Sequence, residues 1–438
     1  MGELTRIVHR VGDVGFGAET RFDAGKLTVC GDEARRILSD PALAGTRVTW
    51  VSPGQPARIV KVLDAVEPRT KGAGGGGIFP GFVSPSGLSP SGHAGEGETH
   101  VLAGAAVVAA GFLPRAQEAL IDMSGPAAPL SPLAQTHNLV VEFEPAEGAA
   151  WEDVDGALRR GVLARAARLA EAALGAPPDQ VDTFPAPAPG ASGNGLPRVA
   201  AITNLQTQGT FKDVFVNGKS FVGGAPTVID ANQLDDGAVV SGQFGHPSLK
   251  NPTYIHQNHP VVAALRARDG HDLHFAGVVI APEPVDQSSK ERVADVTAEL
   301  CKAAGFDAAI ITKEGGGNAD ADVALKMDAL EAAGLIAVGL FAEMAGPDGT
   351  GPPIVVAPTK ATAMVSTGNY DERLSLPEME VALGGTQLDL LGVPATAAME
   401  LPVAVVYCAL SPLGWGRLTC ATAPGEHSPG SPQRTGDT

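Results

Sequence analysis

The sequence predicts an α/β protein in which a β-rich N-terminal domain precedes a domain with a doubly wound parallel sheet. Two observations predict this. Between residue 4 and about residue 145, short runs of alternating polar and apolar residues lie between turn signals, which is typical of strands. Beyond residue 198, apolar strand-like runs alternate with amphipathic helical segments, which is typical of βαβ units.

The first domain is predicted to occupy residues 1–175. Its strands include 26–30, 46–51 and 57–62, and a helix is predicted over 151–174, where Leu158, Val162, Ala166 and Leu169 share one face. Residues 176–197 are rich in Pro, Ala and Gly, and this composition predicts a linker between two domains.

The second domain is predicted to occupy residues 198–421, followed by a disordered tail over 422–438. Strands are predicted at 275–281, 308–312, 335–341 and 363–366, with helices from about 288 and over 320–333. Ser288 and Glu291 have the spacing of a capping box at the start of the first of these helices.

The net charge of −18 over 438 residues argues against nucleic acid or an anionic membrane as a partner, since both attract positive surfaces. No apolar run of about 18 residues, the length that spans a bilayer, is present. The four cysteines are widely spaced, which favours reduced thiols and a cytoplasmic location.

Three glutamates follow successive strands of the second half: Glu283, Glu314 and Glu343. The carboxyl ends of parallel strands meet at one edge, where ligands bind, although strand ends can also simply be polar. Glu314 precedes Gly315, Gly316, Gly317 and Asn318, which lead into a helix, and such a turn offers backbone N–H groups to an anion. We therefore expect a small zwitterion here, with its ammonium on the glutamates and its carboxylate on the amides.

The histidines at 246, 256, 259, 271 and 274 have no cysteine or carboxylate that completes a recognised zinc pattern, so no metal site is predicted. The segment Tyr254–Asn258, which contains His256, lies shortly after Ser241-Gly242.

Several short motifs occur in order along the chain. They include Glu67-Pro68-Arg69, Thr99-His100, Asp236-Gly237-Ala238, Ser241-Gly242, His256 with Asn258, and Glu314-Gly315. Over residues 5–390 these motifs resemble the component B proprotein subunit of the glycine/sarcosine/betaine reductases. The resemblance implies reductive removal of an amine from a small zwitterionic amino acid. It also implies a partner, a second component B-type subunit that bears selenocysteine or cysteine.

With this substrate class, Arg69 is the expected binder of the carboxylate, because a guanidinium can engage it through two hydrogen bonds. His100 and His256 are the expected polar or proton-transfer groups.

The resemblance also implies a pyruvoyl cofactor, which forms when the chain is cut before a cysteine. In this sequence the corresponding residues are Gln243 and Phe244, and phenylalanine has no nucleophilic atom. We therefore expect an unprocessed chain without pyruvoyl, with Ser241 and Ser248 as alternative processing residues. Two other functions remain open: a non-catalytic scaffold for a redox partner, and a biosynthetic enzyme acting on an amino-acid-derived or carrier-bound substrate.

Overall fold

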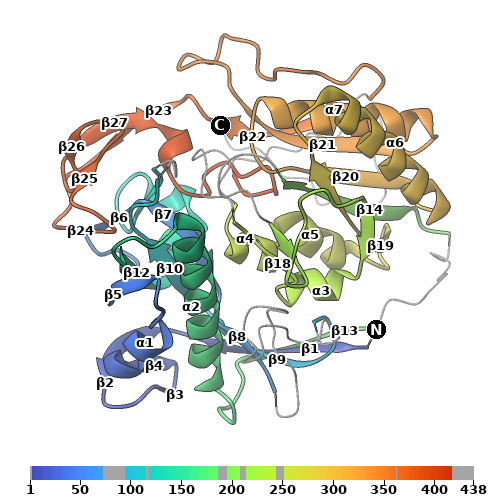
Figure 1. Cartoon of the computed structure of the whole chain (residues 1–438). Helices are drawn as coiled ribbons and strands as arrows, with labels where there is room; N and C mark the ends of the chain where they lie inside the picture. The colour runs from blue at the N-terminus through green and yellow to red at the C-terminus, as the bar shows by residue number, and fades with distance from the viewer. Residues whose placement is uncertain are drawn as a thin grey trace, which may run out of the picture.

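The computed structural model describes residues 2–72, 94–114, 118–185, 195–207, 214–242, 251–361 and 363–416. It shows an α/β protein, as the sequence predicts. Figure 1 shows the strands of the first residues on one side of the molecule and the sheet carrying α6 (Gln287–Ala303) and α7 (Asn318–Ala332) on the other.

In the N-terminal half, one long helix, α2 (Trp151–Glu171), shares a core with strands of three sheets. The apolar face predicted for this helix is buried, and Leu158 and Leu169 pack in one core with Leu63, Val107 and Leu139. The first sheet consists of β13 (Gln180–Phe184), β1 (Leu4–Arg10), β9 (Gly97–Ala103) and β8 (Arg69–Lys71), and the second of β5 (Leu43–Val51), β12 (His137–Pro145), β10 (Ala105–Ala110) and β7 (Val62–Val66). The third sheet consists of β2 (Asp13–Gly17), β4 (Lys26–Cys30) and β3 (Arg21–Asp23). The α-helices described in this half are α1 (Gly31–Ile37) and α2 (Trp151–Glu171).

The C-terminal half contains a six-stranded sheet in the order β17-β19-β14-β20-β21-β22. All its pairings are parallel except that of the edge strand β17 with β19. The four strands predicted here are confirmed, whereas the central strand β14 was not predicted. The strands are β17 (Thr227–Ile229), β19 (His274–Glu283), β14 (Arg198–Gln206), β20 (Ala308–Thr312), β21 (Ile336–Glu343) and β22 (Ala363–Asn369).

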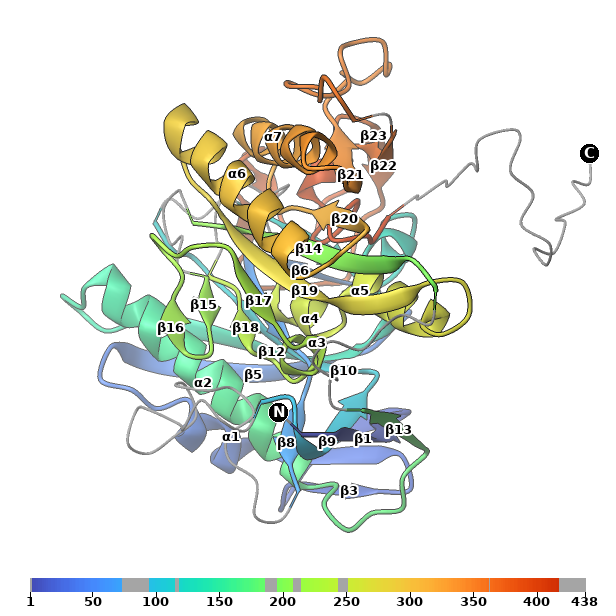
Figure 2. The same ribbon diagram turned by 90° about the vertical axis from the view of Figure 1, so that its right-hand side faces the viewer.

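Helices cover both faces of this sheet. Figure 2 shows α6 and α7 on one side and α3, α4 and α5 on the other. Val279 and Ile311 pack with Met327 of α7, whereas Ile280 packs with Leu265 of α5. The helices are α3 (Ala231–Asp235), α4 (Thr253–Gln257), α5 (Pro260–Arg268), α6 (Gln287–Ala303) and α7 (Asn318–Ala332); a small sheet of β16 (Lys219–Ser220), β15 (Phe215–Val216) and β18 (Val239–Val240) lies nearby.

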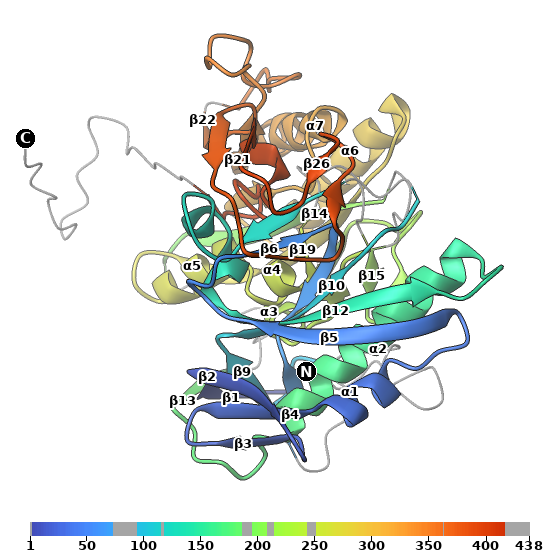
Figure 3. The same cartoon turned by 90° about the vertical axis from the view of Figure 1, so that its left-hand side faces the viewer.

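The chain returns to its N-terminal half after β22. Strand β24 pairs in parallel with β6, whose other neighbour is β11, and Figure 3 shows this returning segment beside β6. The division at residues 175 and 198 therefore remains a prediction. The strands are β6 (Ala57–Val60), β11 (Leu120–Asp122), β23 (Arg373–Leu376), β24 (Val381–Leu383), β25 (Gln387–Leu388), β26 (Val393–Pro394) and β27 (Met399–Pro402).

Part of the predicted linker is a strand. Gln180–Phe184 forms β13, which pairs antiparallel with β1 from Leu4↔Phe184 to Val8↔Gln180. Composition detects the Pro, Ala and Gly residues of this region, but it cannot detect a pairing partner at the start of the chain.

The predicted capping box at Ser288 is wrong. Helix α6 begins at Gln287, and its N-cap is Asp286, whose carboxylate accepts hydrogen bonds from Ser289 N at 2.9 Å and Ser288 Oγ at 2.8 Å. These bonds lower the pKa of Asp286 to about 2. Glu291 instead accepts a hydrogen bond from the side chain of Gln287.

Candidate functional site

A buried histidine–glutamate pair lies at the carboxyl end of β20. His256 Nε2 is 2.9 Å from Glu314 Oε1, and both side chains are fully buried. The second oxygen of Glu314 accepts a hydrogen bond from Gln206 N at 2.7 Å. Both oxygens therefore accept donors, which is the arrangement that suits an ionised carboxylate.

The other ring nitrogen of His256, Nδ1, has no hydrogen-bond partner among the described residues. Because Nε2–H donates to Glu314, a neutral imidazole carries its lone pair on Nδ1. An imidazolium would instead hold a buried N–H without an acceptor, which is costly. The geometry thus makes Nδ1 a base, with Glu314 orienting the ring.

Helix α4 is fixed in place by Asp64 of β7. The Asp64 carboxylate accepts hydrogen bonds from Thr253 N at 2.9 Å and Thr253 Oγ1 at 2.8 Å. Burial raises the pKa of Asp64 to about 6. Thr253 Oγ1 also accepts a hydrogen bond from Ser241 N at 3.0 Å, and Arg159 donates to Ser241 O. Ser241, two residues before the predicted degenerate cleavage site, is therefore held at both backbone atoms.

Gln243 and Phe244, the predicted degenerate cleavage residues, lie outside the described residues, as do His246 and Ser248.

His259 lies beneath the same edge of the sheet. Its Nε2 is 3.0 Å from Thr203 Oγ1 and 3.4 Å from Thr312 Oγ1. Burial, followed by the proximity of His256, lowers the pKa of His259 to about 3. It is therefore a neutral group that fixes the strand ends.

The structure brings together two of the three predicted glutamates. Glu283 Oε1 accepts a hydrogen bond from Glu314 N at 3.3 Å, and Glu283 is fully buried. Burial raises the pKa of Glu283 well above its usual value, and the charges of Asp322 and Glu314 raise it further. Glu343 is only half-buried and accepts a hydrogen bond from Ser366 Oγ. Its strand, β21, is separated from β19 by β14 and β20.

Next to Glu283, buried ion pairs connect α6, α7 and β20. Lys290 pairs with Asp322, Lys313 pairs with Asp320, and Lys326 Nζ lies 3.9 Å from Asp322 Oδ1. Each of these side chains is at most 1% exposed. Sequence reasoning missed this cluster. The available signal was the charged pair Asp322 and Lys326, four residues apart in an otherwise apolar helical segment.

The glycine turn before α7 has the conformation that the sequence suggests. Gly315 and Gly317 have φ values of 80° and 69°, which favour glycine. Gly316 and Gly317 are half-buried and Asn318 is exposed, with Asn318 Nδ2 donating to Val285 O at 3.4 Å. The turn therefore lies near the surface, while Glu314 points inward to His256.

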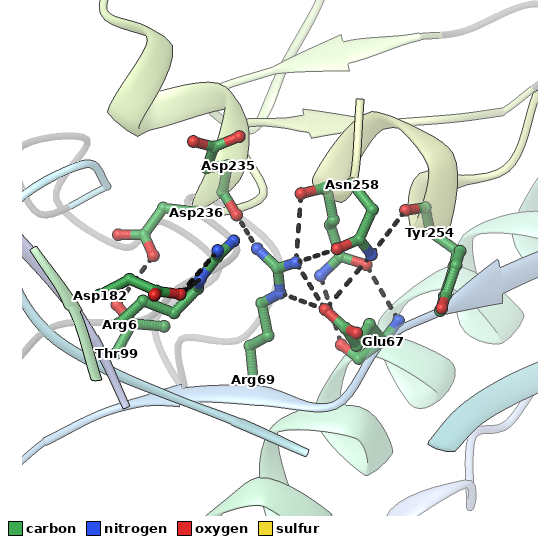
Figure 4. Close-up of polar contacts among 10 residues, drawn as sticks. Arg6, Glu67, Arg69, Thr99, Asp182, Asp235, Asp236, Tyr254 and Asn258 are labelled. Carbon is green, nitrogen blue, oxygen red and sulfur yellow. Dashed lines mark hydrogen bonds and ion pairs between the residues drawn. The ribbon is translucent and has the colours of Figure 1, made fainter. Parts of the chain in front are cut away.

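Arg69 is a structural connector in this geometry (Figure 4). It is 1% exposed, and its guanidinium pairs with Glu67 Oε2. It also donates to Asp235 O, Gln257 O and Asn258 Oδ1. All three guanidinium nitrogens thus donate to the protein, so the carboxylate that Arg69 binds here is that of Glu67.

A second buried ion pair crosses the same region. Lys71 of β8 pairs with Asp236. Asp236 Oδ1 also accepts a hydrogen bond from Thr99 Oγ1 at 2.8 Å, and Figure 4 shows these two side chains. With Arg69, this pair fastens β8 to the segment around α3.

His100 is paired with another histidine. Its Nδ1 is 2.9 Å from His9 Nε2, and the two rings stack with centroids 5.2 Å apart. Burial lowers the pKa of both histidines. Figure 1 shows β9, which carries His100, in a different part of the molecule from α4, which carries His256.

Within the described residues, no group of three or more His, Cys, Asp or Glu side chains is arranged to hold a metal ion. The helices seen in the described part of the chain are too short or too polar to cross a membrane.

The fold and the site define an α/β protein with a buried, glutamate-oriented histidine at the carboxyl edge of a parallel sheet. A model of the family described as glycine/sarcosine/betaine reductase component B subunits matches residues 3–420. The chain belongs to this family.

The relatives are similar over nearly their whole length. The chain is 36% identical over 418 residues to the "Glycine reductase complex component B subunits alpha and beta" of Peptoclostridium acidaminophilum, covering 93% of this chain and 96% of that protein. It is 33% identical over 379 residues to the "Sarcosine reductase complex component B subunit alpha" of the same organism, covering 85% and 87%. It is 31% identical over 438 residues to the "Betaine reductase complex component B subunit alpha" of that organism, covering 93% and 97%. No solved structure matches the chain.

Proposed function

We propose that this chain is a subunit of a component B-type reductase complex that acts on a small zwitterionic amino-acid-type substrate. We further propose that it remains unprocessed and works without pyruvoyl, together with a second subunit that bears selenocysteine or cysteine. Membership of the family supports the first proposal. Phe244 supports the second, because its side chain has no atom that can attack the preceding carbonyl.

The observation that carries the function is the His256–Glu314 pair. The Nδ1 of a neutral His256 has no hydrogen-bond partner among the described residues, and its Nε2 donates to the Glu314 carboxylate, so the ring can accept a proton at Nδ1. Nδ1 of the structural His259 also lacks a partner among the described residues, but His256 differs from His259 in having a carboxylate behind its Nε2. We therefore assign His256 to proton transfer with the substrate and Glu314 to the orientation of its ring.

The substrate carboxylate is assigned to the turn Gly315–Asn318 at the N-terminus of α7. The turn lies near the surface, and helix N-termini attract anions through their N–H groups and the helix dipole. The glutamates are not assigned to the substrate ammonium, because Glu314 already accepts two protein donors and Glu283 is fully buried.

The proposal is tested by turnover of glycine, sarcosine or betaine in the complex assembled with its partner subunits. We expect His256→Ala to reduce kcat at least about a hundredfold, which is the lower range for losing a general base. His271→Ala, at an exposed histidine, is the matched control. Unchanged turnover in an assembled His256→Ala complex would instead identify the chain as a scaffold.

A further inference from the structure

The buried charges beside Glu314 do not balance. Among the described residues, four carboxyl groups and three lysines are linked by ion pairs and electrostatic contacts, and four minus three leaves one excess negative charge. They are Glu283, Glu314, Asp320 and Asp322, with Lys290, Lys313 and Lys326. An uncompensated buried charge is strongly unfavourable, so the cluster requires one additional proton.

Three of the four carboxyl groups have partners that stabilise a carboxylate. Glu314 accepts donors at both oxygens. Asp320 and Asp322 each form an ion pair with a lysine. A proton on Glu314 would displace a hydrogen-bond donor, and a proton on Asp320 or Asp322 would remove the charge that its lysine partner needs.

Glu283 lacks such partners. Its Oε1 accepts one hydrogen bond, from Glu314 N at 3.3 Å, and its Oε2 has no partner among the described residues. The charged groups that face it are Lys290 from α6, Asp322 and Lys326 from α7, and Lys313 and Glu314 after β20. Among the described ion pairs, none brings a lysine nitrogen within 4.0 Å of Glu283.

The proton could alternatively lie on His256. That state would create a buried Nδ1–H without an acceptor, because Nδ1 has no partner in the described part of the chain. Protonated Glu283 instead gains a donor at Oε2, and the nearby Asp322 has a buried Oδ1 without a hydrogen bond among the described residues.

We propose that Glu283 is a neutral carboxylic acid in the folded protein and is a positioning residue for the His256–Glu314 pair. By holding the extra proton, it leaves Glu314 as the anion that faces His256 and keeps His256 Nδ1 unprotonated. This role in proton transfer rests on the proposed function, whereas the protonation state of Glu283 does not.

The test compares the infrared spectrum of the parent protein with those of its variants. All are measured as full-length protein, without ligand, at neutral pH. A protonated carboxyl group shows a carbonyl stretch that carboxylates lack and that shifts in D₂O. We expect this band in the parent protein, its loss in Glu283→Gln, and its retention in the exposed control Glu299→Gln. Absence of the band in the parent, or its survival in Glu283→Gln, would overturn the proposal.

The pH dependence of stability gives a second readout. A carboxyl group with a raised folded-state pKa binds more protons in the folded than in the unfolded state, so its contribution to stability is lost as pH rises. Glu283→Gln should therefore fold, and its stability relative to the parent should increase from acidic to alkaline pH. Failure of this neutral variant to fold, or a constant difference, would count against a neutral Glu283. Neither result depends on substrate binding, so both test the protonation of Glu283 alone. The proposed function is tested separately, by the turnover of the His256→Ala complex.

Discussion

His256 and Glu314 are 58 positions apart in the chain and meet through a 2.9 Å hydrogen bond between fully buried side chains. This contact joins α4, which follows the predicted degenerate cleavage site, to the carboxyl end of β20. The same glutamate anchors β14 through Gln206 N. One residue therefore sets both the histidine tautomer and the position of the strand end.

Glu314→Gln should weaken this arrangement. A glutamine has one acceptor oxygen and one NH₂ group, so it cannot accept from both His256 and Gln206 N. We expect the free energy of unfolding to fall by about 1–3 kcal/mol. Nitrogen NMR of the histidine ring should show that the lone pair is no longer confined to Nδ1. Exposed Glu299→Gln is the control, and an unchanged ring tautomer would contradict the assignment.

Arg69→Met should destabilise the protein by about 3–5 kcal/mol, because Glu67 would remain buried without its partner. Denaturant unfolding measures this loss, and the double variant Glu67→Gln/Arg69→Met should recover part of it. Arg47, in an exposed pair with Glu142, is the matched control, and Arg47→Met should cost less than about 1 kcal/mol. A small effect of Arg69→Met on stability would instead favour the substrate-binding role predicted from sequence.

The purified chain should remain whole. Phe244 has no nucleophile, so mass spectrometry of denatured protein should show one species near 44.4 kDa. Two fragments that meet at 243/244, 240/241 or 247/248 would show that the chain is processed and would restore pyruvoyl as its cofactor.

Gly316→Val should weaken the binding of amino-acid ligands about tenfold or more. The reason is the loss of a set of charge-assisted hydrogen bonds worth roughly 1.5–3 kcal/mol. An added Cβ would lie 3.2 Å from Met344 Sδ, a flexible neighbour, so the fold should tolerate it. Gly12→Val, where an added Cβ meets nothing within 4 Å, is the control. Calorimetric titration with unchanged affinity would remove the turn from the site.

His259 should make the protein sensitive to acid. Its folded-state pKa of about 3 lies below the usual value of 6.5, so the unfolded chain binds a proton more readily and stability falls as pH drops below 6.5. At pH 5 this loss is about 2 kcal/mol. His259→Gln should flatten the stability profile between pH 6.5 and pH 4, measured by denaturant unfolding. A parallel profile would mean that His259 binds protons equally in the folded and unfolded states.

The strands and helices could largely be predicted because their signals are local. Apolar runs such as Ala308–Thr312 and the apolar face of α2 have the periodicity of their structure, and the observed elements lie where these patterns are found. Family membership was also evident from short motifs in order along the chain. Glu283 and Glu314 lie at the carboxyl ends of β19 and β20, which flank β14, and the rule for parallel sheets places such ends at one edge.

Partner choice for charged and polar groups depends instead on distances between segments that are remote in sequence. Arg69 has the chemistry to bind a substrate carboxylate, but folding places Glu67, Asp235 and Gln257 around its guanidinium. The burial of Lys290, Lys313 and Lys326 and the orientation of His256 by Glu314 were likewise decided by tertiary packing. Sequence determines which groups can ionise or donate, whereas burial and neighbouring charges determine which of them do.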